Sequence, residues 1–250
     1  MQRQKNWRYY LFQPYKWLVF GPVLVLSMLL AAVFILLFCR WLPRFCNQKV
    51  APGWCSLNTM TALSSVDVRG RQRMDPNQSY IIVANHLSHF DIFLLYGRLG
   101  LDIRWVMKQE LRSLPFFGVA AEKLGHIYVD RSDRAKAHAQ LKEAQQKFTP
   151  GSSIIFFPEG TRGEGGGLLP FKSGAFVMAK QMQLPILPVV LAGTDAVAPA
   201  RSLDLYPGKT VMTVLEPIAQ NDVIELSHEE LKERARNAIQ TEQNSGQDGE

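Results

Sequence analysis

Acidic residues are missing from the first 66 positions of this 250-residue chain. Those positions hold seven lysines and arginines, whereas the rest of the chain has 21 basic and 22 acidic residues and is close to neutral. The net charge of +6 therefore arises from the amino-terminal segment. A nucleic-acid-binding surface would gather positive charge on the folded domain, so nucleic acid is not expected as a partner. Anionic membrane lipids, which attract basic residues beside an apolar segment, are the expected partner.

Cysteine is also scarce. The chain has three cysteines, Cys39, Cys46 and Cys55, which is an odd number without Cys-x-x-Cys spacing. This pattern provides neither a disulfide framework nor a zinc-binding motif. We expect unreactive thiols in a reducing compartment.

A long apolar run occupies the segment that lacks acidic residues. Residues 17–39 are 23 positions without a charge, and as a helix they would be roughly 34 Å long, enough to cross a bilayer. The run is too long for the apolar part of a cleaved signal peptide, which has about 7 to 15 residues. The sequence therefore predicts a retained membrane-anchoring segment over residues 1–62, with an apolar helix at 17–39.

The sequence leaves the orientation of this anchor open. Four basic residues precede the apolar run and three follow it, a difference too small for the positive-inside rule. A single span would put the amino terminus across the membrane from the rest of the chain. A helix that dips into one leaflet and returns would keep both basic flanks on the cytoplasmic face. Pro22 and a turn at Pro52-Gly53 would permit the bends of the second arrangement.

Strand and helix patterns alternate over residues 63–241. This alternation predicts an α/β domain with a mostly parallel central sheet flanked by helices. Strands are expected at 65–69, 79–84, 104–107, 126–129, 153–157, 186–191 and 210–215. Helices are expected near 91–99, 134–148 and 173–183.

The carboxyl-terminal sequence predicts a final helix and a tail. Ser227-His228-Glu229-Glu230 has the pattern of a capping box and predicts a helix that ends at about Thr241. Residues 242–250 are polar and are expected to form a disordered tail.

A polar motif follows the second predicted strand. The heptad Asn85-His86-Leu87-Ser88-His89-Phe90-Asp91 places a histidine five residues before an aspartate. A histidine can take a proton from a hydroxyl near neutral pH, and a carboxylate beside it can hold its tautomer and stabilise the imidazolium. The spacing has low specificity, and His86, His89 and Asp91 are also metal-ligand types. The heptad by itself leaves proton transfer, metal binding and core structure open.

A second motif, Phe157-Pro158-Glu159-Gly160-Thr161-Arg162, follows the fifth predicted strand. Two polar motifs at two strand ends can converge on one site. Arg162 offers a planar fork suited to a phosphate, and Gly160 lets a ligand approach the backbone closely. The alternative for Arg162 is an internal salt bridge with Glu159 or another carboxylate.

Together, these motifs resemble those of the glycerophospholipid acyltransferase family, which includes the 1-acylglycerol-3-phosphate acyltransferases. Four family blocks occur in order from Asn85 to about Leu191, after an apolar segment of the family's usual kind. The blocks are the heptad, then Lys108-Gln109-Glu110-Leu111 with Gly125-His126-Ile127-Tyr128-Val129-Asp130-Arg131, then the second motif with Phe171-Lys172-Ser173-Gly174, and finally Leu184-Pro185-Ile186-Leu187-Pro188-Val189. The chain departs from the family at His89, where Trp is frequent, and at Gly163, where Ser is frequent.

The resemblance implies an enzyme of phospholipid biosynthesis. It would move a fatty acyl group from acyl-CoA or acyl carrier protein to the 2-hydroxyl of 1-acyl-sn-glycerol 3-phosphate (lysophosphatidate), giving phosphatidate. His86 would be the catalytic base of this HX4D motif and Asp91 its orienting partner. No metal or other cofactor is expected. The resemblance also favours an anchor that dips into the inner (cytoplasmic) membrane, with the catalytic domain on the cytoplasmic side.

The same resemblance implies a set of substrate-binding residues. The loop of Glu159, Gly160, Thr161 and Arg162 would contact the glycerol phosphate. Lys108 and Arg131, each at the end of an apolar run, are candidates for the same phosphate or for charge on the thioester oxygen. A further lysine, Lys172, follows a glycine-rich stretch, but Phe171 occupies the glycine position that a nucleotide-binding loop requires.

Three alternatives stay open on the sequence, one of them a non-enzymatic membrane scaffold. The acceptor could be glycerol 3-phosphate or another lysolipid, because the motifs specify the chemistry better than the headgroup. From another class, a membrane-bound metal-dependent lipid hydrolase would use His86, His89 and Asp91 as ligands.

Overall fold

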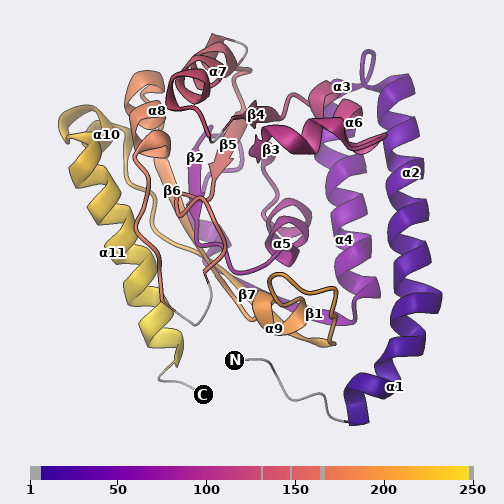
Figure 1. Cartoon of the computed structure of the whole chain (residues 1–250). Helices are drawn as coiled ribbons and strands as arrows, with labels where there is room; N and C mark the ends of the chain where they lie inside the picture. The colour runs from indigo at the N-terminus through magenta and orange to yellow at the C-terminus, as the bar shows by residue number, and fades with distance from the viewer. Residues whose placement is uncertain (1–6, 131, 147, 164–166, 248–250) are drawn as a thin grey trace.

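The computed structural model describes residues 7–130, 132–146, 148–163 and 167–247, and these form a seven-stranded sheet with the order β1-β7-β6-β2-β5-β3-β4 (Figure 1). Five of the six neighbouring strand pairs are parallel. The mostly parallel sheet that the sequence predicts is confirmed. The strands are β1 (Ser64–Arg69), β2 (Ile81–Ala84), β3 (Asp102–Lys108), β4 (Ile127–Val129), β5 (Ser152–Phe156), β6 (Ile186–Ala192) and β7 (Gly208–Val214).

The antiparallel pair consists of β6 and β7. A parallel return needs a crossover, usually a long helix, that carries the chain back along the sheet. Between β6 and β7 the chain forms only the four-residue helix α9 (Thr194–Val197). Strand β7 therefore starts near the end of β6 and runs the other way, while it pairs in parallel with β1.

The central strand β2 is buried on both faces. Ile81 and Val83 belong to one hydrophobic cluster, whereas Ile82 and Ala84 belong to the cluster on the opposite face. This division follows from the two-residue period of a strand. A strand covered on both faces has no polar side, which explains the unbroken apolar run in the sequence.

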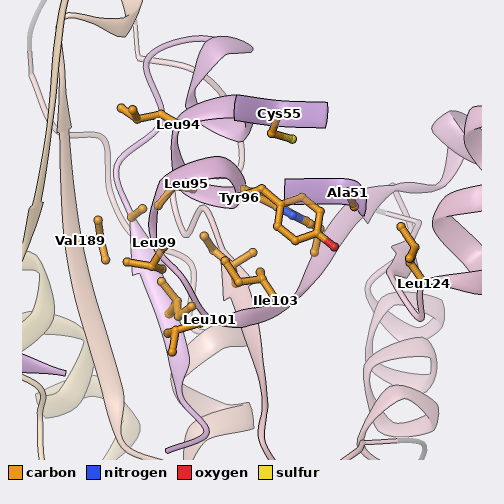
Figure 2. Close-up of a cluster of buried hydrophobic side chains, with 14 of the residues drawn as sticks. Ala51, Cys55, Leu94, Leu95, Tyr96, Leu99, Leu101, Ile103, Leu124 and Val189 are labelled. Carbon is orange, nitrogen blue, oxygen red and sulfur yellow. The ribbon is translucent and has the colours of Figure 1, made fainter. Parts of the chain in front are cut away.

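Helices cover both faces of the sheet. On one face lie α2 (Gly21–Phe38), α4 (Ala51–Thr61), α5 (Phe90–Arg98) and α6 (Phe117–Lys123), and on the other lie α8 (Gly174–Met182), α10 (Gln220–Glu225) and α11 (His228–Gln247), with α7 (Arg134–Gln146) beside β4 (Figure 1). Figure 2 shows side chains of the first face, where Leu94, Leu95 and Leu99 of α5 belong to the same buried cluster as Ile103 of β3 and Val189 of β6. The predicted helices near 91–99, 134–148 and 173–183 are confirmed within two residues.

The apolar anchor is one side of a helical hairpin. Helix α1 (Trp7–Tyr15), a π-helical segment (Lys16–Phe20) and α2 follow one another without a break. Over Tyr9–Phe38 this helix is long and apolar enough to cross a membrane, and only 17% of its most apolar window is buried. The predicted helix at 17–39 is confirmed and begins earlier. After a turn at 39–42 the chain returns through α3 (Pro43–Phe45), a second π-helical segment (Cys46–Val50) and α4, which packs beside α2 (Figure 1).

The predicted turn at Pro52-Gly53 is wrong. Both residues lie in the first turn of α4. The π-helical segment Cys46–Val50 runs directly into α4, and the Ala51 N–H donates to the Cys46 carbonyl five residues back, so the helix turns more widely here. The wider turn accommodates a proline ring, which would clash with the carbonyl four residues back in a regular α-helix. Pro22 likewise lies in the first turn of α2. The chain reverses instead around Leu42, which has a non-helical backbone.

The carboxyl-terminal helix is longer than the sequence predicts. The capping box is present, with the Ser227 N–H donating to the Glu230 carboxylate at 2.8 Å and the Glu230 N–H donating to the Ser227 hydroxyl at 3.3 Å. Helix α11 then continues to Gln247, so the disorder predicted from 242 is wrong as far as 247, and 248–250 lie outside the described residues. Polar side chains support the extra turns, because Gln240 bonds Asn244 and the Ser245 hydroxyl bonds the Thr241 carbonyl.

A buried histidine gives the fold a pH dependence that can be measured. His126 precedes β4, is 9% exposed, and accepts a hydrogen bond at Nδ1 from the Trp105 N–H at 3.3 Å. Burial, with a smaller contribution from Arg104, lowers the pKa of His126 to about 3. The folded protein therefore holds this ring neutral through the physiological range.

We expect the free energy of unfolding to fall as the pH drops below about 6.5. In that range His126 binds a proton in the unfolded chain but stays neutral in the folded protein. The loss should reach on the order of 2 kcal/mol at pH 5. Urea unfolding of the full chain in detergent at pH 7 and pH 5 measures it. His126→Gln should show a smaller difference between the two pH values, and an unchanged difference would contradict the assignment.

Candidate active site

The site is built around the carboxylate of Asp91, in the first turn of α5. Asp91 is completely buried, and its Oδ2 lies 2.7 Å from His86 Nδ1. The same oxygen accepts the N–H groups of Leu87 at 2.7 Å and Ser88 at 2.9 Å. One oxygen thus shapes the turn between β2 and α5 and orients the imidazole. With the proton on Nδ1, the other ring nitrogen, Nε2, presents a lone pair that can accept a proton.

Three further contacts hold the His86 turn in place. The ring of Phe157 stacks on His86 with centroids 3.9 Å apart and an interplanar angle of 11°. The side-chain amide of Asn85 donates to the Leu191 carbonyl at 2.9 Å and accepts the Leu191 N–H at 2.8 Å, which ties the end of β2 to β6. The Ser88 hydroxyl accepts the Phe90 N–H at 3.0 Å at the start of α5, as a capping residue does.

Glu159 joins the two motifs. Its Oε1 accepts the His86 N–H at 2.8 Å, and its Oε2 accepts the Leu169 N–H at 3.0 Å. The Gly163 N–H donates to the His86 carbonyl at 2.9 Å, so both the N–H and the carbonyl of His86 are bonded to the loop of the second motif. Burial raises the pKa of Glu159, and the two backbone hydrogen bonds oppose this rise. The predicted convergence of the motifs at one end of the sheet is therefore confirmed, and Glu159 positions the loop with both of its oxygens engaged.

Arg162 forms no salt bridge with Glu159. The structure records no ion pair between Arg162 and any residue in the described ranges, and its Nη1 is buried without a hydrogen-bond partner there. A buried guanidinium nitrogen without an acceptor costs free energy. This geometry leaves Arg162 with donors available for an anionic ligand.

A cavity of about 740 Å³ opens beside His86 and Arg162. Polar residues of the two motifs and nearby lysines line one part of it, namely His86, His89, Gly160, Thr161, Arg162, Lys108 and Lys172. Apolar residues from α2, α4, α5 and α6 line the rest, among them Ile35, Ala51, Phe93, Ala120 and Leu124. The cavity therefore suits an amphiphile with an anionic head and an apolar chain.

The other residues predicted to contact the phosphate differ in whether they line the cavity and are free to bind an anion. Lys108 lines the cavity, but its Nζ lies 2.8 Å from the Glu110 carboxylate, which already balances its charge. Arg131 lies outside the described residues. Gly160 and Thr161 line the cavity as expected.

The metal-site alternative needs His86, His89 and Asp91 to share one ion. Asp91 Oδ2 is occupied by three hydrogen bonds, one of them to His86 itself. In the parts of the chain that the structure describes, no three His, Cys, Asp or Glu side chains are placed to share a metal ion. His89 lines the cavity, and desolvation lowers its pKa, with the neighbouring Arg162 guanidinium and His86 ring lowering it further.

Sequence reasoning missed two contributions to the site. Phe157 is a motif residue that was assigned no function, and it supplies the face on which His86 stacks. Lys172 was considered only as a nucleotide-binding lysine, and it lines the cavity beside Gly160. The available signal for both was their position directly before or shortly after the Glu159–Arg162 loop.

The fold and the site are those of the acyltransferase family, and the chain belongs to this family. The family model described as Acyltransferase matches residues 65–192. The 1-acyl-sn-glycerol-3-phosphate acyltransferase of Escherichia coli (strain K12) is 33% identical over 218 residues, which cover 85% of this chain and 86% of that enzyme. The enzyme of that name from Helicobacter pylori (strain J99) is 37% identical over 155 residues, 62% of this chain and 65% of that protein.

A solved structure has the same architecture. The crystal structure of the 1-acyl-sn-glycerophosphate (LPA) acyltransferase PlsC from Thermotoga maritima superposes with a TM-score of 0.80 and 26% sequence identity, and the match covers 96% of each chain. The likeness therefore extends over the amino-terminal hairpin as well as the sheet. The chain spans about two thirds of the Helicobacter pylori enzyme and about half, 52%, of a chloroplastic relative from Brassica napus.

Glu159→Gln tests the two hydrogen bonds by which Glu159 links the motifs. A glutamine side chain has one acceptor oxygen, so either the His86 N–H or the Leu169 N–H would lose its partner. We expect a loss of about 1–3 kcal/mol in the free energy of unfolding, the cost of leaving a buried donor unsatisfied. Urea unfolding measures it, with the exposed Glu225→Gln as the matched control. Equal stability of the two variants would show that the hydrogen bonds of Glu159 contribute little to the free energy of unfolding.

Proposed function

We propose that this chain transfers a fatty acyl group from acyl-CoA or acyl carrier protein to the 2-hydroxyl of 1-acyl-sn-glycerol 3-phosphate, giving phosphatidate for phospholipid biosynthesis. The observation that carries the proposal is the His86–Asp91 pair beside a cavity lined by Arg162 and by apolar residues of α2, α4, α5 and α6. Within the described ranges Arg162 has no ion-pair partner, and its Nη1 is buried without a hydrogen bond. The relatives named 1-acyl-sn-glycerol-3-phosphate acyltransferase support the same reaction.

The geometry supports a mechanism with His86 as general base. Nε2 takes the proton of the acceptor hydroxyl as that oxygen attacks the thioester carbonyl, and Asp91 stabilises the imidazolium. A new C–O bond forms, the C–S bond breaks, and the leaving thiolate takes the proton from Nε2. A thiol with a pKa of about 8.5 is a good leaving group, so no stronger acid is needed. The reaction balances without a metal or redox cofactor.

Arg162 is assigned to the acceptor phosphate. Its fork-shaped guanidinium matches phosphate oxygens, and the structure leaves it without a carboxylate partner in the described ranges. Gly160 and Thr161 belong to the same loop and border the cavity. Lys108 and Arg131 are assigned to the same phosphate or to charge on the thioester oxygen, and a bound anion would have to draw Lys108 from Glu110.

The amino-terminal hairpin is assigned to the inner (cytoplasmic) membrane, with the catalytic domain on the cytoplasmic side. The exposed apolar surface of Tyr9–Phe38 and the basic residues around it favour a bilayer with anionic headgroups. Residues of α2 line the cavity, and Ala32 and Ile35 are buried against the domain. A helix that forms a cavity wall stays docked on the domain, which favours an anchor that dips into one leaflet over a full span.

His86→Ala should lower kcat by about a hundred- to ten-thousandfold, the usual contribution of a general base. Detergent-purified protein with labelled acyl-CoA and lysophosphatidate measures the transfer, and flotation with vesicles measures membrane binding, which should be retained. The exposed His228→Ala on α11 is the matched control. Activity of His86→Ala near that of the parent would exclude His86 as the base.

Arg162→Ala should impair a phosphate-bearing acceptor more than a neutral one. Loss of a charge-assisted hydrogen bond of about 1.5–3 kcal/mol lowers kcat/KM for lysophosphatidate by roughly ten- to a hundredfold. The same assay with 1-acylglycerol should show a much smaller change, and Arg236→Ala on α11 is the control. Equal losses with both acceptors would assign Arg162 to loop structure.

A further inference from the structure

Lys172 is a cationic cavity residue with no part in the transfer chemistry described above. Its backbone N–H donates to the Pro158 carbonyl at 2.8 Å, which fixes its position against the loop of the second motif. Its side chain is exposed and lines the same cavity as His86 and Arg162.

The side chain of Lys172 extends over Gly160. A Cβ placed on Gly160 would lie 2.6 Å from Lys172 Nζ and 2.8 Å from its Cε. Gly160 also has a φ of 72°, in the left-handed region that favours glycine. The ammonium group therefore lies in the space that a side chain at position 160 would fill.

Two positive charges at this place have no ion-pair partner among the described residues. Within the described ranges neither Lys172 nor Arg162 forms an ion pair. Lys108 is paired with Glu110, and the lowered pKa of His89 keeps that ring neutral at pH 7. Two uncompensated cations on one cavity repel each other unless an anion lies between them.

We propose that Lys172 binds the acceptor phosphate together with Arg162, and that this pair makes the site prefer lipids with a terminal phosphate monoester over phosphodiester lipids. The inference rests on the proposed function. A phosphate monoester carries a charge of about −1.5 to −2 at pH 7, because its second pKa is near 6. A phosphodiester carries a single negative charge, which Arg162 balances without help. The second cation therefore contributes to binding of the monoester and little to binding of the diester.

The test compares two acceptors that differ in this charge. Lysophosphatidate is the monoester, and 1-acyl-glycerophosphoglycerol is the diester, each assayed with saturating acyl-CoA and the detergent-purified full chain. In Lys172→Ala and Lys172→Gln the ratio of kcat/KM for monoester over diester should fall by about ten- to a hundredfold, mainly through KM for the monoester. Lys172→Arg, which keeps the charge, should restore most of the preference. Lys142→Ala removes an exposed lysine of α7 away from the cavity and should leave the ratio unchanged.

Two outcomes would overturn the inference. Equal losses with both acceptors would give Lys172 a structural role. A rise in KM for acyl-CoA, with the acceptor preference unchanged, would assign Lys172 to the phosphates of the donor.

A binding measurement separates this inference from the proposed function. If the parent protein made no phosphatidate, the proposed function would fail, and phosphate binding could still be read from thermal unfolding with sn-glycerol 3-phosphate. We expect this ligand to raise the unfolding temperature of the parent and to raise that of Lys172→Ala much less. An equal rise in both would exclude Lys172 from phosphate binding.

Discussion

The hydrogen bonds to Asp91 Oδ2 are the constraint on which the rest of the site depends. A fully buried carboxylate is costly unless donors surround its charge. Here the donors are His86 Nδ1 and the N–H groups of Leu87 and Ser88, with the amino-terminal end of α5 adding favourable partial charge. The same bonds that make the buried charge tolerable also shape the loop and orient the histidine, so catalytic geometry and local stability cannot be separated at this point.

The amino-terminal hairpin connects membrane association with substrate binding. Helix α2 exposes apolar side chains on one side and lines the cavity with Met28, Ala31, Ala32 and Ile35 on the other. The apolar section of the cavity is thus bordered by the segment best suited to contact lipid. A lipid acceptor would reach His86 along an apolar path and would meet the cations of the second motif with its head. This arrangement explains why one helix is apolar around most of its circumference.

Much of the fold follows from sequence patterns, and the exceptions have physical causes. All seven predicted strands are present, because buried strands and their flanking turn residues leave a clear local signal. The antiparallel direction of β7 was not predicted, since it depends on whether the chain after β6 returns along the sheet before it forms the next strand. The predicted turn at Pro52-Gly53 failed because a proline can also lie inside a helix directly after a wider π-helical turn. Helix α11 passes position 241 because bonds such as Gln240 to Asn244 extend it.

For the site, the sequence by itself determined which residue types are available and that His86, Asp91 and Arg162 follow strand ends, because hydrophobic period and motif spacing are local properties. Tertiary structure decided their partners. Glu159 bonds to the His86 backbone across 73 positions of sequence, Phe157 stacks on the same residue, and Lys172 lies over Gly160. Such contacts depend on strand order and on the packing of separate loops, and no local pattern encodes them. The same holds for Arg162, which forms no ion pair within the described ranges, because its neighbours are also set by tertiary packing.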